Sequence, residues 1–182
     1  TTTRPSDTIY GFNNSAGVSY AFNVNAIPYY CIWDAGGVDT LDASGFSQNQ
    51  TINICDGYFS NIGAGLSNVS IAVGALIENA VGGGGNDIIV GNNLNNTING
   101  GSGNDILIGN GGNDTIVGGL GTDYACYAYN HTSYAVTYDS GLYTITSVYE
   151  GIDSLSGIEY LRCLDGDYLI SSFLAGGDYN AP

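Results

Sequence analysis

Five consecutive nonapeptides run in register: GGGGNDIIV (82–90), GNNLNNTIN (91–99), GGSGNDILI (100–108), GNGGNDTIV (109–117) and GGLGTDYAC (118–126). Three of them fit the pattern G-G-x-G-x-D-x-U-x, in which U is a large aliphatic residue or, in the last repeat, alanine. Glycine in the first positions allows positive φ angles in a turn. The last three positions have the length of a short strand, whose side chains alternate between two faces. The pattern therefore predicts a turn and a strand in every nine residues.

Alternation within each strand places position eight inward and positions seven and nine outward. The inward residues are Ile89, Ile98, Leu107, Ile116 and Ala125. Two nonapeptides then form one coil of eighteen residues, with one strand in each of two stacked sheets. The expected fold is all-β, a right-handed parallel β-roll, and its turns stack at a spacing of eighteen residues.

The nonapeptide resembles the calcium-binding repeat of RTX proteins, and its residues explain the choice of ion. The spacing of eighteen places Asp87, Asp105 and Asp123 on one edge, and Asn96 and Asp114 on the other. Stacked carboxylates repel one another unless a cation lies between them. Ca²⁺ accepts about six to eight oxygen ligands, whereas Mg²⁺ requires a tighter octahedron. We expect complete sites between the three aspartates of the first edge and a weaker site between Asn96 and Asp114, where asparagine replaces aspartate.

Carbonyl oxygens of the turns would complete these sites. The turn glycines concerned are Gly82, Gly83, Gly85, Gly100, Gly101, Gly103, Gly109, Gly112, Gly118, Gly119 and Gly121. A flexible glycine-rich linker is the alternative, but a linker would not keep this register. Residues 73–81 form one more nonapeptide length, with Glu78 at the aspartate position and Ala80 inward, and residues 64–72 place Ile71 inward. The roll is therefore expected to begin near residue 64.

Composition excludes several classes of function. The chain of 182 residues has a net charge of −15, and Arg4 and Arg162 are its basic side chains apart from one histidine. Nucleic acids and anionic membranes are poor partners for such a surface, because both are bound by basic patches. There is no apolar run long enough for a membrane span and no signal peptide. The sequence contains no methionine, which indicates a fragment or a processed product of a longer precursor.

The four cysteines lack the C-x-x-C spacing of a zinc ribbon or a thioredoxin motif. They are Cys31, Cys55, Cys126 and Cys163. Four cysteines allow three disulfide pairings. Pairing of Cys31 with Cys55 and of Cys126 with Cys163 is one hypothesis, and buried free thiols are an equal alternative.

A wider resemblance covers roughly residues 3–126 and is carried by several segments in a fixed order. They are DTIYGFN (7–13), IWDAGGVDTLDASG (32–45), TINI (51–54), NVSIA (68–72) and IENAVGG (77–83). In order and spacing this resembles the C-terminal domain of the serralysins, which are secreted bacterial zinc metalloproteases. The segment at 32–45 is more specific than the repeats, which occur in many toxins, lipases and epimerases.

The resemblance implies two further calcium sites. One would use backbone oxygens of Arg4, Ser6, Thr8 and Gly36 with the side chains of Asp34 and Asp39. The other would use the carbonyl oxygens of Gly37 and Leu76 with Asp39 and Glu78. The family usually has glycine where Ser6 stands and often threonine where Leu76 stands, and a backbone ligand tolerates both changes. Trp33 is expected to be a core aromatic residue.

The motifs of catalysis are missing from this sequence. Serralysins carry H-E-x-x-H on a helix, with two histidines on zinc and glutamate as the base. This chain has one histidine, His131, which is interpreted as a surface or packing residue. There is no G-x-S-x-G motif. A carboxylate pair of the glycosidase type is not excluded by counting acids, but metal binding explains those acids more simply. The chain is expected to have no catalytic site.

The likeness to serralysins fades after residue 126. Residues 134–138 and 143–148, separated by Asp139-Ser140-Gly141, predict a β-hairpin; residues 158–161 and 168–170 predict two more strands. The expected division is therefore a β lead-in (1–63), the roll (64–126), a C-terminal cap (127–176) and a tail (177–182). The tail lacks the acidic-then-aliphatic end that serralysins present to their exporter.

Two hypotheses for function follow. The first is a non-catalytic calcium-binding domain of a secreted, extracellular serralysin-like protein, with an N-terminal protease domain as its partner. The second is a structural subunit of an extracellular filament, surface layer or adhesive assembly, in which copies of the chain are the partners.

Overall fold

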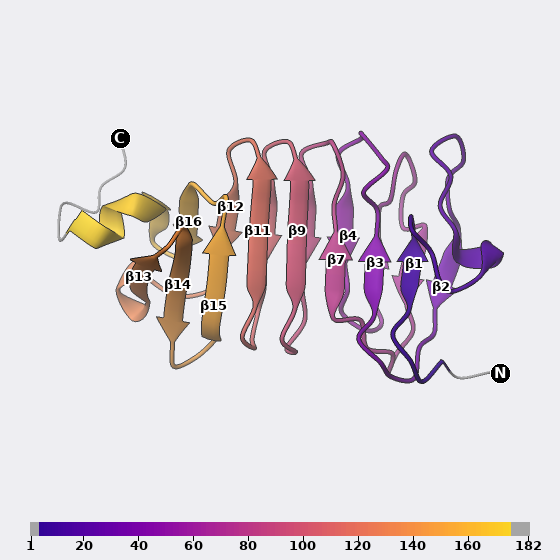
Figure 1. The fold of residues 1–182 in the computed structure, drawn as a ribbon, viewed down its shortest axis with the longest axis horizontal. Coiled ribbons are helices and arrows are strands. Elements are labelled where there is room, and N and C mark those ends of the chain that lie inside the picture. The colour runs from indigo at the N-terminus through magenta and orange to yellow at the C-terminus, as the bar shows by residue number, and fades with distance from the viewer. Residues whose placement is uncertain (1–3, 176–182) are drawn as a thin grey trace.

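The computed structural model describes residues 4–175 and shows strands stacked along one long axis (Figure 1). The repeats pair as the period of eighteen predicts. In one sheet Ile88 lies beside Ile106 and Ile106 beside Tyr124, and in the other Thr97 lies beside Thr115, always in parallel. The predicted all-β roll is therefore confirmed.

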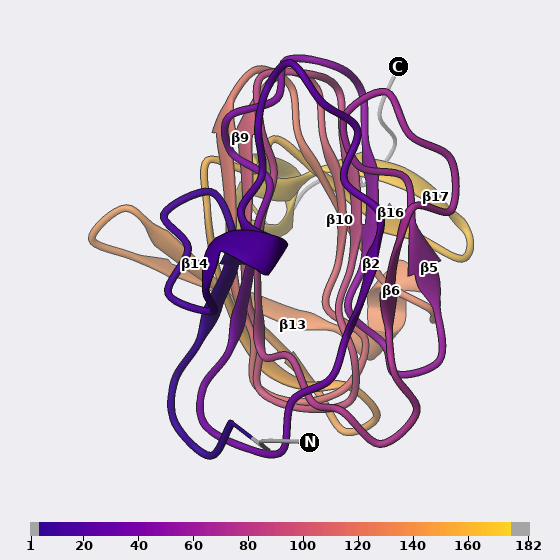
Figure 2. The same cartoon turned by 90° about the vertical axis from the view of Figure 1, so that its right-hand side faces the viewer.

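Two sheets face each other across the core (Figure 2). The eight-stranded sheet has the order β1 (Ile9–Gly11), β3 (Thr40–Asp42), β7 (Asn79–Val81), β9 (Thr97–Ser102), β11 (Thr115–Leu120), β15 (Gly151–Ser156), β14 (Leu142–Ser147), β13 (Ala135–Asp139). The six-stranded sheet has the order β17 (Gly166–Leu169), β16 (Tyr160–Cys163), β12 (Tyr124–Cys126), β10 (Ile106–Ile108), β8 (Ile88–Val90), β4 (Thr51–Asn53). From β7 to β12 the chain alternates between these two sheets, so consecutive turns of the repeats fall on opposite edges of the roll.

The inward residues of the repeats form the core. Ile89, Ile98, Leu107 and Ala125 are 0% exposed and Ile116 is 1% exposed, whereas the outward Ile88 is 39% exposed. One aliphatic side chain from each strand, enclosed by its neighbours above and below, is enough to make a continuous core.

Parallel pairing already begins well upstream of residue 64. Strand β1 pairs with β3, β3 with β7, and β4 with β8. The period is hidden there because the chain makes an excursion between β4 and β7. A third sheet of β2 (Tyr30–Ile32), β6 (Val69–Ile71) and β5 (Phe59–Ser60) forms in part from that excursion. Ile71 is buried, but it belongs to this third sheet.

The C-terminal part closes the roll. Strands β13 and β14 form the predicted hairpin, and β16 and β17 are the predicted pair around Asp165-Gly166. Strand β15 was not predicted; it pairs in parallel with β11, and β16 pairs in parallel with β12. Short 3₁₀ helices lie at Val18–Tyr20, His131–Ser133 and Ile170–Ala175. The tail at 177–182 lies outside the described residues.

Two side-chain expectations are decided by the structure. Trp33 is 54% exposed, so its prediction as a core residue is wrong; Ile32 before it is 0% exposed, and alternation turns the next side chain outward. All four cysteines are free, so neither predicted disulfide is present, but only Cys163 is buried and Cys31 is exposed, so the alternative of buried free thiols holds fully for Cys163 alone. Within residues 4–175, no helix has the length and apolarity needed to cross a membrane.

Candidate metal centre

The position-six side chains on one edge form a continuous ladder, here called the Asp105 edge. Its members are Gln50, Asp87, Asp105, Asp123 and Glu159. The backbone N–H of Asp87 donates to Asp105 Oδ1 at 2.8 Å, and that of Asp105 donates to Asp123 Oδ1 at 2.8 Å. The ladder extends to Gln50, whose N–H donates to Asp87 Oδ1, and to Glu159, whose Oε2 accepts from Asp123 N–H. The predicted stacking of the three aspartates is therefore present.

The opposite edge, here called the Asp114 edge, is interrupted. Its members are Thr8, Asp39, Glu78, Asn96, Asp114 and Asp153. The N–H of Asp39 donates to Glu78 Oε2 at 2.8 Å, and the N–H of Asp114 donates to Asp153 Oδ1 at 2.9 Å. Asn96 N–H donates to Asp114 Oδ1 at 2.8 Å, but no bond of this kind joins Glu78 to Asn96 among the hydrogen bonds of the described residues.

Four carboxylates of the two edges each keep one oxygen without a hydrogen-bond partner. These are the Oδ2 atoms of Asp39, Asp105, Asp114 and Asp123. The four residues are at most 1% exposed. A buried carboxylate oxygen without a donor is costly unless a cation compensates it. The residues present therefore fit a bound metal ion.

Glycine leaves space beside these oxygens. A Cβ added at Gly100 would lie 2.3 Å from Asp105 Oδ2, one at Gly109 would lie 2.1 Å from Asp114 Oδ2, and one at Gly118 would lie 2.6 Å from Asp123 Oδ2. Any side chain at the first position of these repeats would thus clash with the unpartnered oxygen. The approach of these carboxylates to the backbone therefore requires glycine at the first position of the repeat.

Burial also shows in the acid–base behaviour of these carboxyls. It raises the pKa of Asp105 to about 6 and that of Asp114 to about 7, with smaller contributions from the neighbouring acids. Burial likewise raises the pKa of Asp39 to about 6, and Asp34 and Glu78 contribute to the shift. Each shift means that the fold by itself disfavours the ionised form of the carboxyl group.

The segments of the first implied lead-in site lie together. Asp34 Oδ1 accepts from the N–H groups of Ala35 and Gly36, and Ala35 N–H donates to the Arg4 carbonyl at 3.4 Å. Asp39 Oδ1 accepts from Thr8 N–H at 2.8 Å, and Thr8 Oγ1 donates to the Ser6 carbonyl at 2.8 Å.

The second implied site shares Asp39 with the first. A Cβ on Gly37, whose φ is +126°, would lie 2.6 Å from the Ser6 backbone, so only glycine fits there. Glu78 Oε2 accepts a hydrogen bond from the backbone N–H of Asp39 at 2.8 Å. Leu76 has a half-exposed side chain, and only its backbone is a candidate ligand.

Two acidic residues of the ladders were missed by the sequence analysis. They are Asp153 and Glu159. The hairpin between β12 and β15 places Asp153 39 residues after Asp114 and Glu159 36 residues after Asp123, instead of the expected eighteen. The signal was present: Gly151, Asp153 and Leu155 have the spacing of positions four, six and eight of the repeat.

Asparagines at position five form a second ladder that was also missed. Asn104 N–H donates to Asn86 Oδ1 at 2.8 Å, and Thr122 N–H donates to Asn104 Oδ1 at 2.9 Å. On the other edge Asn113 N–H donates to Asn95 Oδ1 at 2.8 Å. These side chains accept from the following coil, whereas the position-six side chains accept from the preceding one.

The donor set is one of oxygens. Within residues 4–175, no three side chains of His, Cys, Asp or Glu converge as a metal-binding group. A site at these turns would therefore need backbone carbonyls to complete its coordination, which suits Ca²⁺. His131 lies elsewhere: its Nδ1 is 2.7 Å from Asp165 Oδ2, and its ring packs on Tyr168 at 4.5 Å between centroids.

Comparison with known proteins identifies the family. Residues 1–162 match the family model described as Peptidase M10 serralysin C terminal. The chain is 52% identical over 99 residues to Metallopeptidase AprA of Pseudomonas marginalis. The matched segment covers 53% of this chain and 20% of that protein. The chain is 51% identical over 100 residues to a serralysin of Proteus mirabilis, with 54% and 20% covered. It thus spans about a fifth of the length of these relatives. The chain belongs to the serralysin C-terminal domain family.

Proposed function

We propose that this chain is a non-catalytic domain that binds several calcium ions and folds with them. The observation that carries the proposal is the set of four buried, unpartnered carboxylate oxygens aligned along the two turn edges. An ion that binds only the folded state stabilises it, by about 2.7 kcal/mol per site at a hundredfold excess over Kd. Several such sites together would supply the stability of an ordinary domain.

The roll sites would be held by Asp87, Asp105, Asp123 and Glu159 on one edge and by Asp114 and Asp153 on the other. The lead-in sites would be held by Asp34, Asp39 and Glu78. Turn carbonyls of the glycines named above, and those of Arg4, Ser6, Thr8 and Leu76, would complete them. A bound calcium ion neutralises the facing carboxylates, and the protein supplies the fixed cradle that favours a large oxygen-seeking ion.

Calcium dependence would also couple folding to location. In a compartment with little calcium the acidic turns repel one another and the glycine-rich coils pay their full conformational entropy. The chain would then remain unfolded and able to pass through an exporter, and it would fold outside the cell. Support for secretion comes from the family, and the route of export is part of the proposal.

The proposed partner is an N-terminal protease domain of a longer protein. The relatives bear the names of serralysins and metallopeptidases, and this chain corresponds to a fifth of their length. The alternative of a structural subunit in an extracellular assembly has no similar support from the relatives. The purified chain should hydrolyse no casein with zinc and calcium present; hydrolysis that disappears in a His131→Ala variant would contradict a non-catalytic role.

Circular dichroism with and without a chelator tests calcium-coupled folding. The β-sheet signal is expected in millimolar calcium, and it should be lost in EGTA and return when calcium is restored. Because calcium is proposed to supply most of the stability, an unchanged β-sheet spectrum in EGTA would contradict the proposal.

A further inference from the structure

One turn of the Asp114 edge is built differently from the others. In the aspartate turns, a carboxylate accepts a backbone N–H from the preceding coil. In the turn at 91–96 (GNNLNN) the polarity is reversed: Asn96 Nδ2 donates to the Glu78 carbonyl of the preceding coil at 3.0 Å. The same nitrogen donates to Asn92 Oδ1 at 3.1 Å, and Asn96 Oδ1 accepts from Asn92 N–H at 2.8 Å. Asn96 is 2% exposed and both ends of its amide are used.

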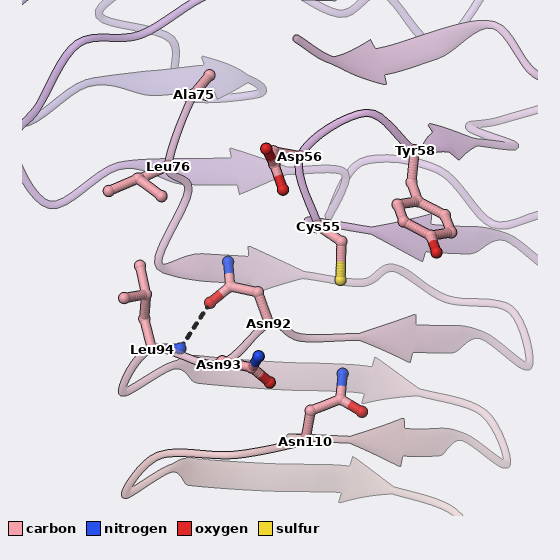
Figure 3. A pocket seen from close by; sticks show the side chains of 9 residues that line it. All are labelled: Cys55, Asp56, Tyr58, Ala75, Leu76, Asn92, Asn93, Leu94 and Asn110. Atoms are coloured by element: carbon pink, nitrogen blue, oxygen red, sulfur yellow. Dashed lines mark hydrogen bonds between the residues drawn. The ribbon is translucent and has the colours of Figure 1, made fainter. Parts of the chain in front are cut away.

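Asn92 makes a second connection to the preceding chain. Its Nδ2 donates to the Ile77 carbonyl at 2.8 Å and to the Ile54 carbonyl at 3.3 Å, while its Oδ1 accepts from Leu94 N–H at 2.9 Å. Figure 3 shows Asn92 on the wall of a cavity of about 350 Å³, with its bond to Leu94 inside the same turn. Two side-chain amides thus tie this turn to three backbone carbonyls.

This turn contrasts with its neighbours in what it leaves unsatisfied. Asp105, Asp114 and Asp123 each keep a buried oxygen that needs a cation. At Asn96 the corresponding side chain carries hydrogens toward the preceding coil, and those hydrogens satisfy the Glu78 carbonyl. Amide hydrogens and a calcium ion both place positive charge between oxygens, so one can take the structural role of the other.

We propose that the paired amides of Asn92 and Asn96 close this turn without calcium, in place of an ion between Glu78 and Asn96. The proposal rests on the calcium-binding function proposed above. Because both ends of its amide are used, the Asn96 side chain would also contribute no ligand to the weaker site expected between Asn96 and Asp114. The proposal also divides the roll into parts: the turn between β8 and β9 closes by hydrogen bonds, whereas the aspartate turns between β7 and β8 and from β9 to β12 close around ions.

Replacement of the Asn96 side-chain nitrogen by oxygen tests the proposal. Asn96→Asp turns a donor into an oxygen that faces the Glu78 carbonyl and Asn92 Oδ1. The calcium concentration at the midpoint of folding, followed by circular dichroism, should rise by about twofold or more. The lost hydrogen bonds destabilise the fold, and because several ions bind on folding, the shift in concentration is modest. Calorimetry should then count one more calcium ion than in the wild type, since three oxygens now converge.

Asn93→Asp is the matched control, because Asn93 is an exposed amide in the same turn and the charge change is identical. This control should fold at wild-type calcium with wild-type stoichiometry. If Asn96→Asp matches the control in both readouts, the proposal is overturned. A wild type that binds no calcium would instead overturn the proposed function, which makes the two failures distinguishable.

Hydrogen exchange on the wild type tests the same idea without a variant that could fail to fold. Thr97 N–H donates to the Glu78 carbonyl at 3.1 Å, beside the amide-closed turn, and Ile106 N–H donates to the Asp87 carbonyl at 2.9 Å, beside an aspartate turn. As calcium is raised, Thr97 should become protected at a lower concentration than Ile106. Simultaneous protection, or protection of Ile106 first, would overturn the proposal.

Discussion

The Asp105 edge carries acids at four consecutive position-six sites, from Asp87 to Glu159, whereas Asn96 divides the acids of the Asp114 edge into two groups. On the first edge each acid between the two ends has an acidic neighbour on both sides. On the second edge Asp114 has an amide on one side and Asp153 on the other. The backbone stacks in the same way on both edges. Carboxylates face one another without interruption on the Asp105 edge, whereas on the Asp114 edge an amide separates them at Asn96.

Removal of the central aspartate should show this difference most strongly. Asp105→Ala removes a carboxylate that lies between Asp87 and Asp123. The variant should therefore lose two calcium ions and about 5 kcal/mol of the free energy of unfolding at saturating calcium. Asp114→Ala should abolish one ion and about half of that free energy. Alanine is preferred to asparagine because an amide can substitute for the ion. Calorimetric stoichiometry measures both variants, and equal losses would contradict the difference between the edges.

The acids found beyond the repeats should each matter for one ion. Glu159→Ala, which ends the Asp105 edge, and Asp153→Ala, which ends the Asp114 edge, should each lose one calcium ion and about 2–3 kcal/mol. Asp139→Ala is the control, because Asp139 is an exposed acid on β13. Chemical denaturation in calcium gives the free energies. A variant that behaves like the control would remove its residue from the ladder.

Glycine requirements should be the same on both edges, since coil spacing rather than charge sets them. Gly103 (φ +119°) and Gly112 (φ +121°) would each bring a Cβ to 2.3 Å from a carbonyl of the preceding coil. Alanine at either position should cost about 1–3 kcal/mol. Gly111→Ala, with its nearest contact at 3.6 Å, should cost less. Thermal melts in calcium measure the three variants, and a well-tolerated Gly112→Ala beside a damaging Gly111→Ala would refute the stacking geometry.

Low pH should stabilise the calcium-free fold, but by a smaller free energy than calcium does. The folded-state pKa values of Asp105 and Asp114, about 6 and about 7, lie above the usual value of 3.8. Protonation therefore favours the fold fully below about pH 4, and this contribution disappears as pH rises through 6–7. Calcium-free protein should recover β-sheet signal between pH 8 and pH 5, with the upper part of the change lost in Asp114→Ala. A signal that declines over this range would have the wrong sign.

The sequence predicted the part of the fold in which the period is unbroken. The five inward residues, Ile89, Ile98, Leu107, Ile116 and Ala125, are buried as expected. The stacking of Asp87, Asp105 and Asp123 followed from a spacing of eighteen. The role of these residues as calcium ligands stays a prediction.

The period failed as a guide where the chain leaves the roll and returns. The excursion between β4 and β7 and the hairpin before β15 insert residues without changing which strands stack, so pairing at separations of 37 and 39 residues was hidden. The amide connections of Asn92 and Asn96 depend on side-chain direction within one turn, which composition does not encode.

The most direct test of calcium binding at the turn edges is a crystal structure of the chain grown in calcium, with anomalous scattering to locate the ions. Ions are expected beside the unpartnered oxygens of Asp39, Asp105, Asp114 and Asp123, and none between Glu78 and Asn96. A roll whose buried carboxylates have no ion beside them, with calcium confined to exposed acids such as Asp139, would contradict it.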